Sequence, residues 1–326
     1  MKDLTKKILG GYRFTDTKEL LAVAESMPRE ELYEVCHELT REMMGDGFDT
    51  CSIINVKGGN CPEDCAWCTQ SAHYKTESET HGVLPMETVR DQALYNERQG
   101  IGRFSLVASG KRPNAREIAA YAEMFREIKA KGGIHLCASL GLATKEQLQT
   151  LKDAGCTTYH CNMESAPSHF GKLVTTHTQA DKEETIRCAR EVGMRACSGG
   201  IIGMGETREQ RAEFALYLAS LGISSIPINF LHPMPGTPLG DRSPLDDEEL
   251  LFAVCLFRLA NPAAFLRFSG GRALYSEATQ RKALYIGMNA AITGDLLTTK
   301  ASVTERDMKL FGEAGYDVKE ETTWER

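Results

Sequence analysis

Short runs of β-branched and apolar residues alternate along this chain with longer segments whose apolar positions recur every three or four residues. The short runs are typical of buried strands, and the longer segments are typical of amphipathic helices. Several helical segments end on glycine, as in NAREIAAYAEMFREIKAKG and KEETIRCAREVG, and glycine commonly terminates helices. The pattern predicts strands over 50–56, 103–109, 134–139, 157–163, 196–202, 225–231, 264–269 and 291–297.

Strands that alternate with helices in this way predict an α/β fold with a parallel sheet. Eight such strands favour a single (β/α)8 barrel of the TIM type over 50–300, with an N-terminal helical extension over 1–48 and a C-terminal segment over 301–326. An open doubly wound sheet is the competing architecture. A barrel would place its chemistry at the carboxyl ends of the strands.

Composition limits the function further. The 326 residues carry a formal net charge of −7, which argues against a nucleic acid as the main partner. The start, MKDLTKKILGGYRF, lacks the apolar stretch of a secretory signal, and no later run approaches the ~20 apolar residues of a membrane span. We therefore expect a cytoplasmic protein without a membrane partner. Its 11 cysteines should be thiols or metal ligands rather than disulfides.

Three cysteines are crowded into the segment CPEDCAWCTQSAHY, directly after the first predicted strand. Cys61, Cys65 and Cys68 have the spacing C-x3-C-x2-C, and three thiolates can each bind one iron of a [4Fe–4S] cluster. The fourth iron would then be open to a small molecule. Zinc is the alternative metal, with His73 as fourth ligand, but the spacing differs from that of zinc fingers.

This cysteine loop, with Trp67 before its third thiol, resembles that of the radical S-adenosylmethionine (SAM) enzymes. Further segments follow in an order similar to that of the biotin synthase family. They are GGNCPEDCAWCTQSAHY, YHCNMESAPSHFGKLVTTHT, CSGGIIGMGET, IPINFL, LRFSGGR and LLTT, and the resemblance extends to LFGEAGY near the end.

The resemblance implies that SAM binds the open iron and is cleaved reductively to a 5′-deoxyadenosyl radical. In this family the radical removes hydrogens from dethiobiotin, and a second, buried iron–sulfur cluster supplies the sulfur that closes the ring. The resemblance also implies an electron donor such as flavodoxin or ferredoxin, and a homodimer. A barrel suits this chemistry because a reactive radical must be shielded from solvent and aimed at one bond.

Ligand-binding residues are carried over from the same resemblance. Asn162 and Asn229 match positions that hold the ureido group of the substrate, and an amide can both donate to and accept from a urea. Glu164 matches the position that binds the SAM ribose, where the family usually has the shorter aspartate. The remaining matches are Lys182 for the SAM carboxylate and Gly199, Gly200 and Ile201 for the adenine.

The chain departs from the family at the auxiliary cluster, which is usually a [2Fe–2S] cluster on three cysteines and one arginine. Cys137, Cys197 and Arg267 match three of these positions, but the fourth is Ser105, whose hydroxyl is a poor ligand for iron–sulfur chemistry. We therefore expect a rearranged cluster, [2Fe–2S] or larger, in which Cys161 or His160 supplies the missing bond.

Strand parity argues against Cys161: if Asn162 and Glu164 face the barrel interior, so does His160, and Cys161 faces the helices. Five other cysteines fit helix, strand or loop patterns and are interpreted as packed thiols: Cys36, Cys51, Cys156, Cys188 and Cys255.

Two other functions stay open at this point. One is a related radical SAM barrel, such as a hydrogenase maturase or a methylornithine synthase, which shares the triad but needs no sulfur-donor cluster. The other is a zinc-stabilised binding protein without catalysis.

Overall fold

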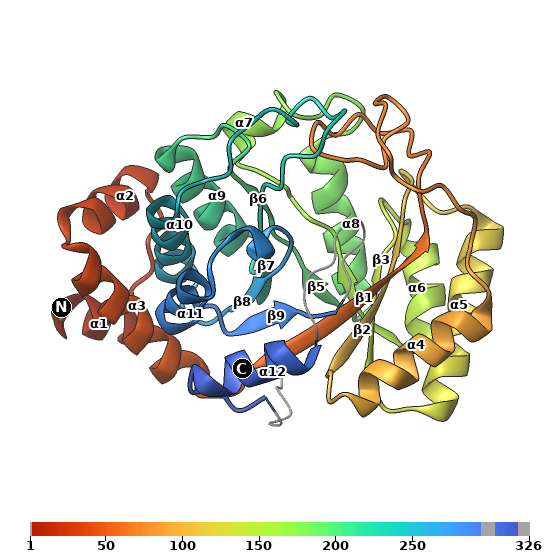
Figure 1. Ribbon diagram of the computed structural model, residues 1–326, viewed down its shortest axis with the longest axis horizontal. Helices are drawn as coiled ribbons and strands as arrows, with labels where there is room; N and C mark the ends of the chain where they lie inside the picture. Colours follow the sequence, from red (N-terminus) through yellow and green to blue (C-terminus); the bar gives the residue numbers. More distant parts are fainter. Residues whose placement is uncertain (1, 295–303, 319–326) are drawn as a thin grey trace.

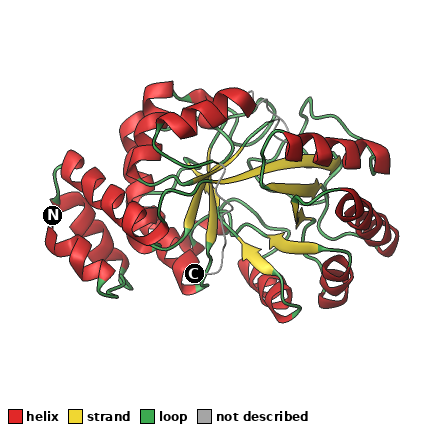
Figure 2. Cartoon of the chain, turned by 90° about the horizontal axis from the view of Figure 1, so that it is seen from below, coloured by secondary structure: helices red, strands yellow, loops and turns green. Residues whose placement is uncertain are grey.

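The chain forms one parallel β-barrel with helices outside it and three further helices attached to one side (Figure 1). The computed structural model describes residues 2–294 and 304–318. Seen from below, the strands are surrounded by helices (Figure 2). This is the predicted (β/α)8 fold, and the alternative of an open sheet is wrong because the sheet closes on itself.

All strand pairs are parallel, in the order β5-β4-β3-β2-β1-β9-β8-β7-β6. A further pairing between Cys197 of β5 and Ser225 of β7 closes the barrel. The strands are β1 (Asp49–Lys57), β2 (Arg103–Ala108), β3 (His135–Ser139), β4 (Cys156–His160), β5 (Arg195–Cys197), β6 (Gly200–Ile202), β7 (Ser225–Phe230), β8 (Phe265–Phe268) and β9 (Ala290–Ile292).

The strand predicted over 196–202 is divided into β5 and β6, with Ser198 and Gly199 between them. The chain at Gly199 lies so close to β7 that a Cβ there would be 1.9 Å from the carbonyl oxygen of Pro227. Both segments pair with β7, so they share one of the eight strand positions of the barrel.

Most of the helices around the barrel begin at residues suited to capping. Four of them start with a capping box, in which the first side chain and the one three residues later bind each other's backbone N–H groups: Asn114/Glu117, Thr144/Gln147, Thr178/Asp181 and Thr207/Gln210. The helices are α4 (Met86–Arg98), α5 (Ala115–Lys131), α6 (Lys145–Asp153), α7 (Pro167–Phe170), α8 (Gln179–Glu191), α9 (Arg208–Ser220), α10 (Asp247–Ala260) and α11 (Glu277–Ile286), with a short 3₁₀ helix at Arg272–Leu274.

The segment expected to form a helical extension contains α1 (Lys2–Leu9), α2 (Thr17–Ser26) and α3 (Arg29–Met44). Helix α3 packs against α10 and α11, and α2 packs against α9. The apolar face of α3, with Leu32, Val35 and Leu39, is fully buried. The three helices therefore share the hydrophobic core of the barrel.

Helix α12 (Thr304–Glu313) returns to the start of β1. Its Phe311 ring stacks on Phe48 with centroids 4.1 Å apart, and Asp307 accepts a 3.0 Å hydrogen bond from Arg272 Nη1. Strand β9 ends at Ile292, and residues 295–297 of the strand predicted over 291–297 lie outside the described residues. The LLTT motif, at 296–299, lies outside the described residues.

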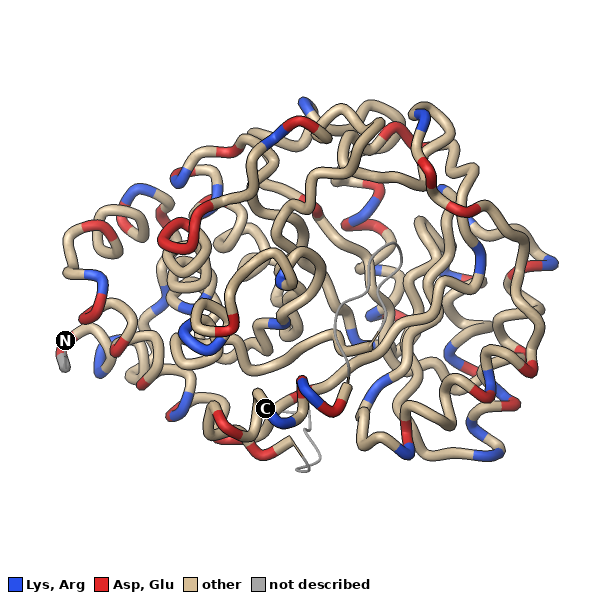
Figure 3. Tube along the Cα trace, viewed as in Figure 1, with Lys and Arg blue, Asp and Glu red and all other residues tan. Residues whose placement is uncertain are grey.

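Positive and negative side chains are interspersed along the described chain (Figure 3). None of the helices in its described ranges is long and apolar enough to cross a membrane.

Candidate active site

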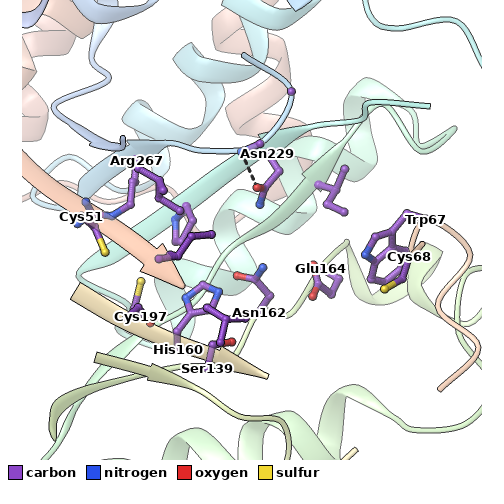
Figure 4. A pocket seen from close by; sticks show the side chains of 18 of the residues that line it. Cys51, Trp67, Cys68, Ser139, His160, Asn162, Glu164, Cys197, Asn229 and Arg267 are labelled. Carbon is purple, nitrogen blue, oxygen red and sulfur yellow. Dashed lines mark hydrogen bonds between the residues drawn. The ribbon is translucent and has the colours of Figure 1, made fainter. Parts of the chain in front are cut away.

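A cavity of about 370 Å³ opens at the carboxyl ends of the strands and extends into the barrel (Figure 4). A second cavity of about 200 Å³ adjoins it, and both are lined by Cys68, His160, Asn162 and Glu164. The volume of the first cavity falls within the range of small-molecule sites. Its position is the one expected for the active site of a TIM barrel.

The cysteine loop follows β1 and is fixed at both ends by backbone hydrogen bonds. The Cys61 N–H donates to the Gln70 carbonyl at 2.9 Å, and the Ala72 N–H donates to the Cys61 carbonyl at 2.8 Å. The Ala66 N–H donates to the Leu173 carbonyl at 3.0 Å, which ties the loop to the segment after α7. These contacts hold the three thiols on one side of the second cavity.

The thiols of Cys61, Cys65 and Cys68 are half-buried and line the second cavity together. Burial raises the pKa of Cys65, and it raises the pKa of Cys68 to about 11. Thiolates at these positions therefore need a cation such as iron nearby. Three thiols in one loop, beside an open space, fit a [4Fe–4S] cluster with one iron left free.

The zinc alternative finds less support in the geometry. His73 is exposed, and its Nε2 lies 3.0 Å from the carbonyl oxygen of Pro62. Within 2–294 and 304–318, no three His, Cys, Asp or Glu side chains approach closely enough to hold one metal ion. Thiols that each bind a different iron of a cluster do not need to approach so closely.

Along β4 and the residues after it, every second side chain lines the first cavity: Thr158, His160, Asn162 and Glu164. This is the alternation expected for a strand with one face toward the barrel interior. Cys161 lines the second cavity instead, with the loop cysteines, and its N–H donates to the Cys197 carbonyl at 3.0 Å.

Glu164 lies in a tight turn beside β6. Its φ of +69° is in the left-handed region, which is unusual for a residue with a side chain. Hydrogen bonds to the Gly199 carbonyl, at 3.0 Å, and from the Ile201 N–H, at 2.9 Å, hold the turn. A Cβ at Gly200 would be 2.3 Å from the Glu164 carbonyl oxygen, so this approach requires glycine.

The charge of Glu164 is set by burial and by one lysine. Burial raises the pKa of Glu164, whereas Lys182 and the Asn162 amide act in the opposite direction. Lys182, on α8, is itself buried and lines the second cavity with the loop cysteines. The structure thus brings together the acid and the base that the sequence predicted for SAM binding.

The two candidate amides are partly engaged by backbone. Asn162 Oδ1 accepts a 2.9 Å hydrogen bond from the Gly199 N–H. Asn229 Nδ2 donates to the Gly200 carbonyl at 3.0 Å, and its Oδ1 accepts from the Gly270 N–H at 2.8 Å. Both side chains line the first cavity, and these contacts fix their orientation toward it.

Trp67 and Ile201 pack at the edge of a small apolar cluster above the barrel. The buried members of the cluster are Ala66, Phe170, Leu173, Val174, Met204, Leu231 and Leu239. It covers the entrance side of the cavity with apolar surface.

At the closed end of the first cavity lie Cys137, Cys197 and Arg267, which the sequence predicted, together with Ser105. Cys51, on β1, lines the same space. Contact with Cys137 and burial raise the pKa of the Cys51 thiol, and the same contact lowers the pKa of Cys137. Sequence reasoning missed Cys51, although its odd-numbered position on β1 shares a strand face with Asp49 and Ile53.

Three charged side chains form a buried network at this end. Arg103 Nε donates to Asp49 Oδ2 at 2.8 Å, and Arg267 Nη2 donates to Asp49 Oδ1 at 2.5 Å, with all three side chains at most 3% exposed. Burial lowers the pKa of Arg267, but Asp49 together with Cys51 and Cys197 more than offsets this, so the guanidinium stays charged. His160 is partly buried, and desolvation, with the nearby charges of Arg267 and Lys182, lowers its pKa to about 4.

Two family profiles match the chain: the radical SAM superfamily over residues 55–218, and the Biotin and Thiamin Synthesis associated domain over residues 227–317. The chain is 61% identical over 308 residues to a biotin synthase of Porphyromonas gingivalis, covering 94% of this chain and 93% of that protein. It is 51% identical over 326 residues to a biotin synthase of Parabacteroides distasonis, covering 100% and 99%.

Among solved structures, methylornithine synthase superposes with a TM-score of 0.82 over 96% of each chain, at 16% identity. A maturase of the [FeFe]-hydrogenase superposes with a TM-score of 0.79 over 97% of this chain and 74% of that one, at 18% identity. These two structures show that the barrel fold is shared. The much higher sequence identities to the two biotin synthases indicate the function. The chain belongs to the biotin synthase family of radical SAM enzymes.

Proposed function

We propose that this enzyme inserts sulfur into dethiobiotin inside the barrel, with SAM at the mouth of the cavity and an auxiliary iron–sulfur cluster at its closed end. The observation that supports this most directly is the order of groups along the two adjoining cavities (Figure 4). Loop thiols lie at one end, buried thiols lie at the other, and the two amides lie between them.

When bound, a [4Fe–4S] cluster on Cys61, Cys65 and Cys68 supplies the electron that cleaves SAM, and the auxiliary cluster supplies sulfur. The protein's own residues position the reactants. We assign Glu164 to the ribose hydroxyls of SAM, since a carboxylate can accept from both. Lys182 would hold the SAM carboxylate.

The adenine of SAM is assigned to the strip of backbone at Gly199 and Gly200, with Ile201 and Trp67 as apolar partners. The glycines fix the position of this strip, because Pro227 fills the space of a Cβ at Gly199 and the Glu164 backbone fills it at Gly200. The apolar cluster behind Trp67 and Ile201 would exclude water from this part of the site.

Asn162 and Asn229 are assigned to the ureido ring of dethiobiotin. Each amide already has a backbone contact that fixes its rotation, so a donor and an acceptor are presented to the substrate without further ordering. Cys137, Cys197 and Arg267 remain the residues proposed for the auxiliary site.

The electron donor we propose is a flavodoxin or ferredoxin. We also propose a homodimer and a cytoplasmic location.

The proposal is tested by measuring 5′-deoxyadenosine formation from SAM under anaerobic conditions with dithionite, with and without dethiobiotin. We expect dethiobiotin to stimulate cleavage in the wild type, and Cys65→Ala to abolish cleavage, because a cluster held by two thiols cannot present the open iron. Undiminished cleavage by Cys65→Ala would overturn the loop assignment. A wild-type enzyme that cleaves SAM but neither binds nor responds to dethiobiotin would favour a related radical enzyme.

A further inference from the structure

The buried end of the barrel contains three thiols, two of which were expected there. Cys51, Cys137 and Cys197 come from β1, β3 and β5, and all three line the first cavity. Cys51 and Cys137 are in direct contact through their thiols. In Figure 4 the sulfur atoms of Cys51 and Cys197 both point into the space beside Arg267.

The position of Cys51 follows from strand parity. On β1, Cys51 and Ile53 line the cavity, whereas Ser52 turns away from it and accepts a 2.9 Å hydrogen bond from Asn96 of α4. Across β1 and β2, Cys51 pairs with Arg103, and Ile53 pairs with Ser105. Cys51 and Ser105 therefore face the same interior space from neighbouring strands, two residues apart in register.

Two guanidinium groups lie beside the three thiols. Arg103 and Arg267 both line the first cavity, and both pair with the buried carboxylate of Asp49. The Arg267 Nη1 donates to the carbonyls of Asp49 and Ala291, at 3.0 and 3.2 Å, and its Nη2 donates to Asp49. A guanidinium held in this way offers positive charge rather than a lone pair.

The other candidates for the missing ligand are less suitable. Ser105 offers a hydroxyl, which binds iron well only when it is deprotonated. Cys161 lines the second cavity and not the first. His160 lines both cavities, so it is the strongest alternative.

We propose that Cys51 is a ligand of the auxiliary iron–sulfur cluster, together with Cys137 and Cys197, and that it replaces the ligand absent at Ser105. The inference rests on the proposed function, which requires an auxiliary cluster. In this arrangement Arg267 and Arg103 offset the negative charge of the thiolates. Thiolate donors are the ligands that iron–sulfur clusters prefer.

The test is the amount of iron and acid-labile sulfide per chain, with Mössbauer spectra, after anaerobic reconstitution. The iron content of Cys51→Ala should fall to about four per chain, the content of one [4Fe–4S] cluster. Its Mössbauer spectrum should lose the signal of the auxiliary cluster. Cys255→Ala is the matched control, because Cys255 is a fully buried thiol on α10 that lines neither cavity. It should keep the wild-type content of both clusters.

A second test moves the thiol to the neighbouring strand. It does not rely on a single variant folding correctly. Cys51→Ser should lose the auxiliary iron, and adding Ser105→Cys to it should restore that iron. Restoration would show that the loss is due to a missing ligand and not to general damage. Failure of the double variant to recover iron, with an unchanged melting temperature, would overturn the proposal.

The remaining outcomes separate this inference from the proposed function. A wild-type chain with only about four irons would refute the auxiliary cluster itself. If both the wild type and Cys51→Ala hold two clusters, only the assignment of Cys51 as a ligand is refuted, and the auxiliary cluster stands. Loss of the auxiliary iron in His160→Ala or Cys161→Ala, with Cys51→Ala unaffected, would assign the ligand to that residue instead.

Discussion

The close approach of Gly200 to the Glu164 turn gives a direct test of the SAM assignment. In Gly200→Ala the new Cβ would lie 2.3 Å from the Glu164 carbonyl oxygen, 2.4 Å from its carbonyl carbon and 2.5 Å from its Cα. All three atoms are backbone, so no side-chain rotation can relieve the contact. Restoring an ordinary separation of 3.4 Å would move the two segments apart by about 1 Å.

The turn has little freedom to absorb that movement. Glu164 already has a left-handed φ, and its hydrogen bonds connect it to Gly199 and Ile201 on either side of the substituted position. The displacement should therefore be transmitted to the Glu164 carboxylate. A misplacement of about 1 Å in a positioned group can reduce a rate by roughly a hundredfold.

We expect kcat/KM for SAM cleavage to fall by about this factor in Gly200→Ala, and the free energy of unfolding to fall by roughly 1–3 kcal/mol because of overpacking. The assay is 5′-deoxyadenosine formation over a range of SAM concentrations, with iron content measured in parallel. Gly171→Ala is the control, since a Cβ at Gly171 would meet nothing within 4 Å. A Gly200→Ala enzyme with full iron and wild-type kcat/KM would refute the role of this turn.

Two further predictions concern substrate binding and pH. Asn229→Ala should weaken dethiobiotin binding by roughly 1–3 kcal/mol, measured by anaerobic calorimetry, because a buried urea would lose its partner; unchanged affinity would contradict the assignment. Glu249 pairs with Arg208 and Arg211. Burial raises the pKa of Glu249, but the two arginines more than offset this and leave it below the ordinary value. Its stabilising effect should be complete above about pH 4.3, the ordinary glutamate pKa, and be lost as pH falls through the lower folded value. Glu249→Gln should therefore lower the urea midpoint at pH 7, and the difference from the wild type should shrink on acidification; a difference independent of pH would contradict this.

Periodicity was sufficient to predict the barrel, because most strands are short and largely apolar, and most of the helices between them have clear capping signals. It failed at the strand predicted over 196–202, which is divided at Gly199. That division depends on the contact between Gly199 and Pro227 of β7, 28 residues away in the chain. A local pattern carries no information on such a contact.

The cysteine loop could be predicted because its three thiols are close in sequence, so their spacing alone indicates the chemistry. The three thiols at the closed end of the first cavity come from β1, β3 and β5, and their meeting depends on the register of strands that are distant in sequence. A single cysteine in a strand has no such spacing, and packed thiols are common, so Cys51 was interpreted as core.

The buried charges would have been the better signal at this end of the barrel. Interiors of such barrels are usually filled by branched apolar side chains, and an uncompensated buried charge is costly. Asp49 lies two residues before Cys51, and Arg103 lies two residues before Ser105, each on the same strand face as its neighbour. Charged residues that alternate with a thiol or hydroxyl inside predicted strands therefore indicate a polar interior, and a polar interior in a closed barrel indicates a buried ligand. Every cysteine on those faces, including Cys51, is then a candidate ligand of that buried group.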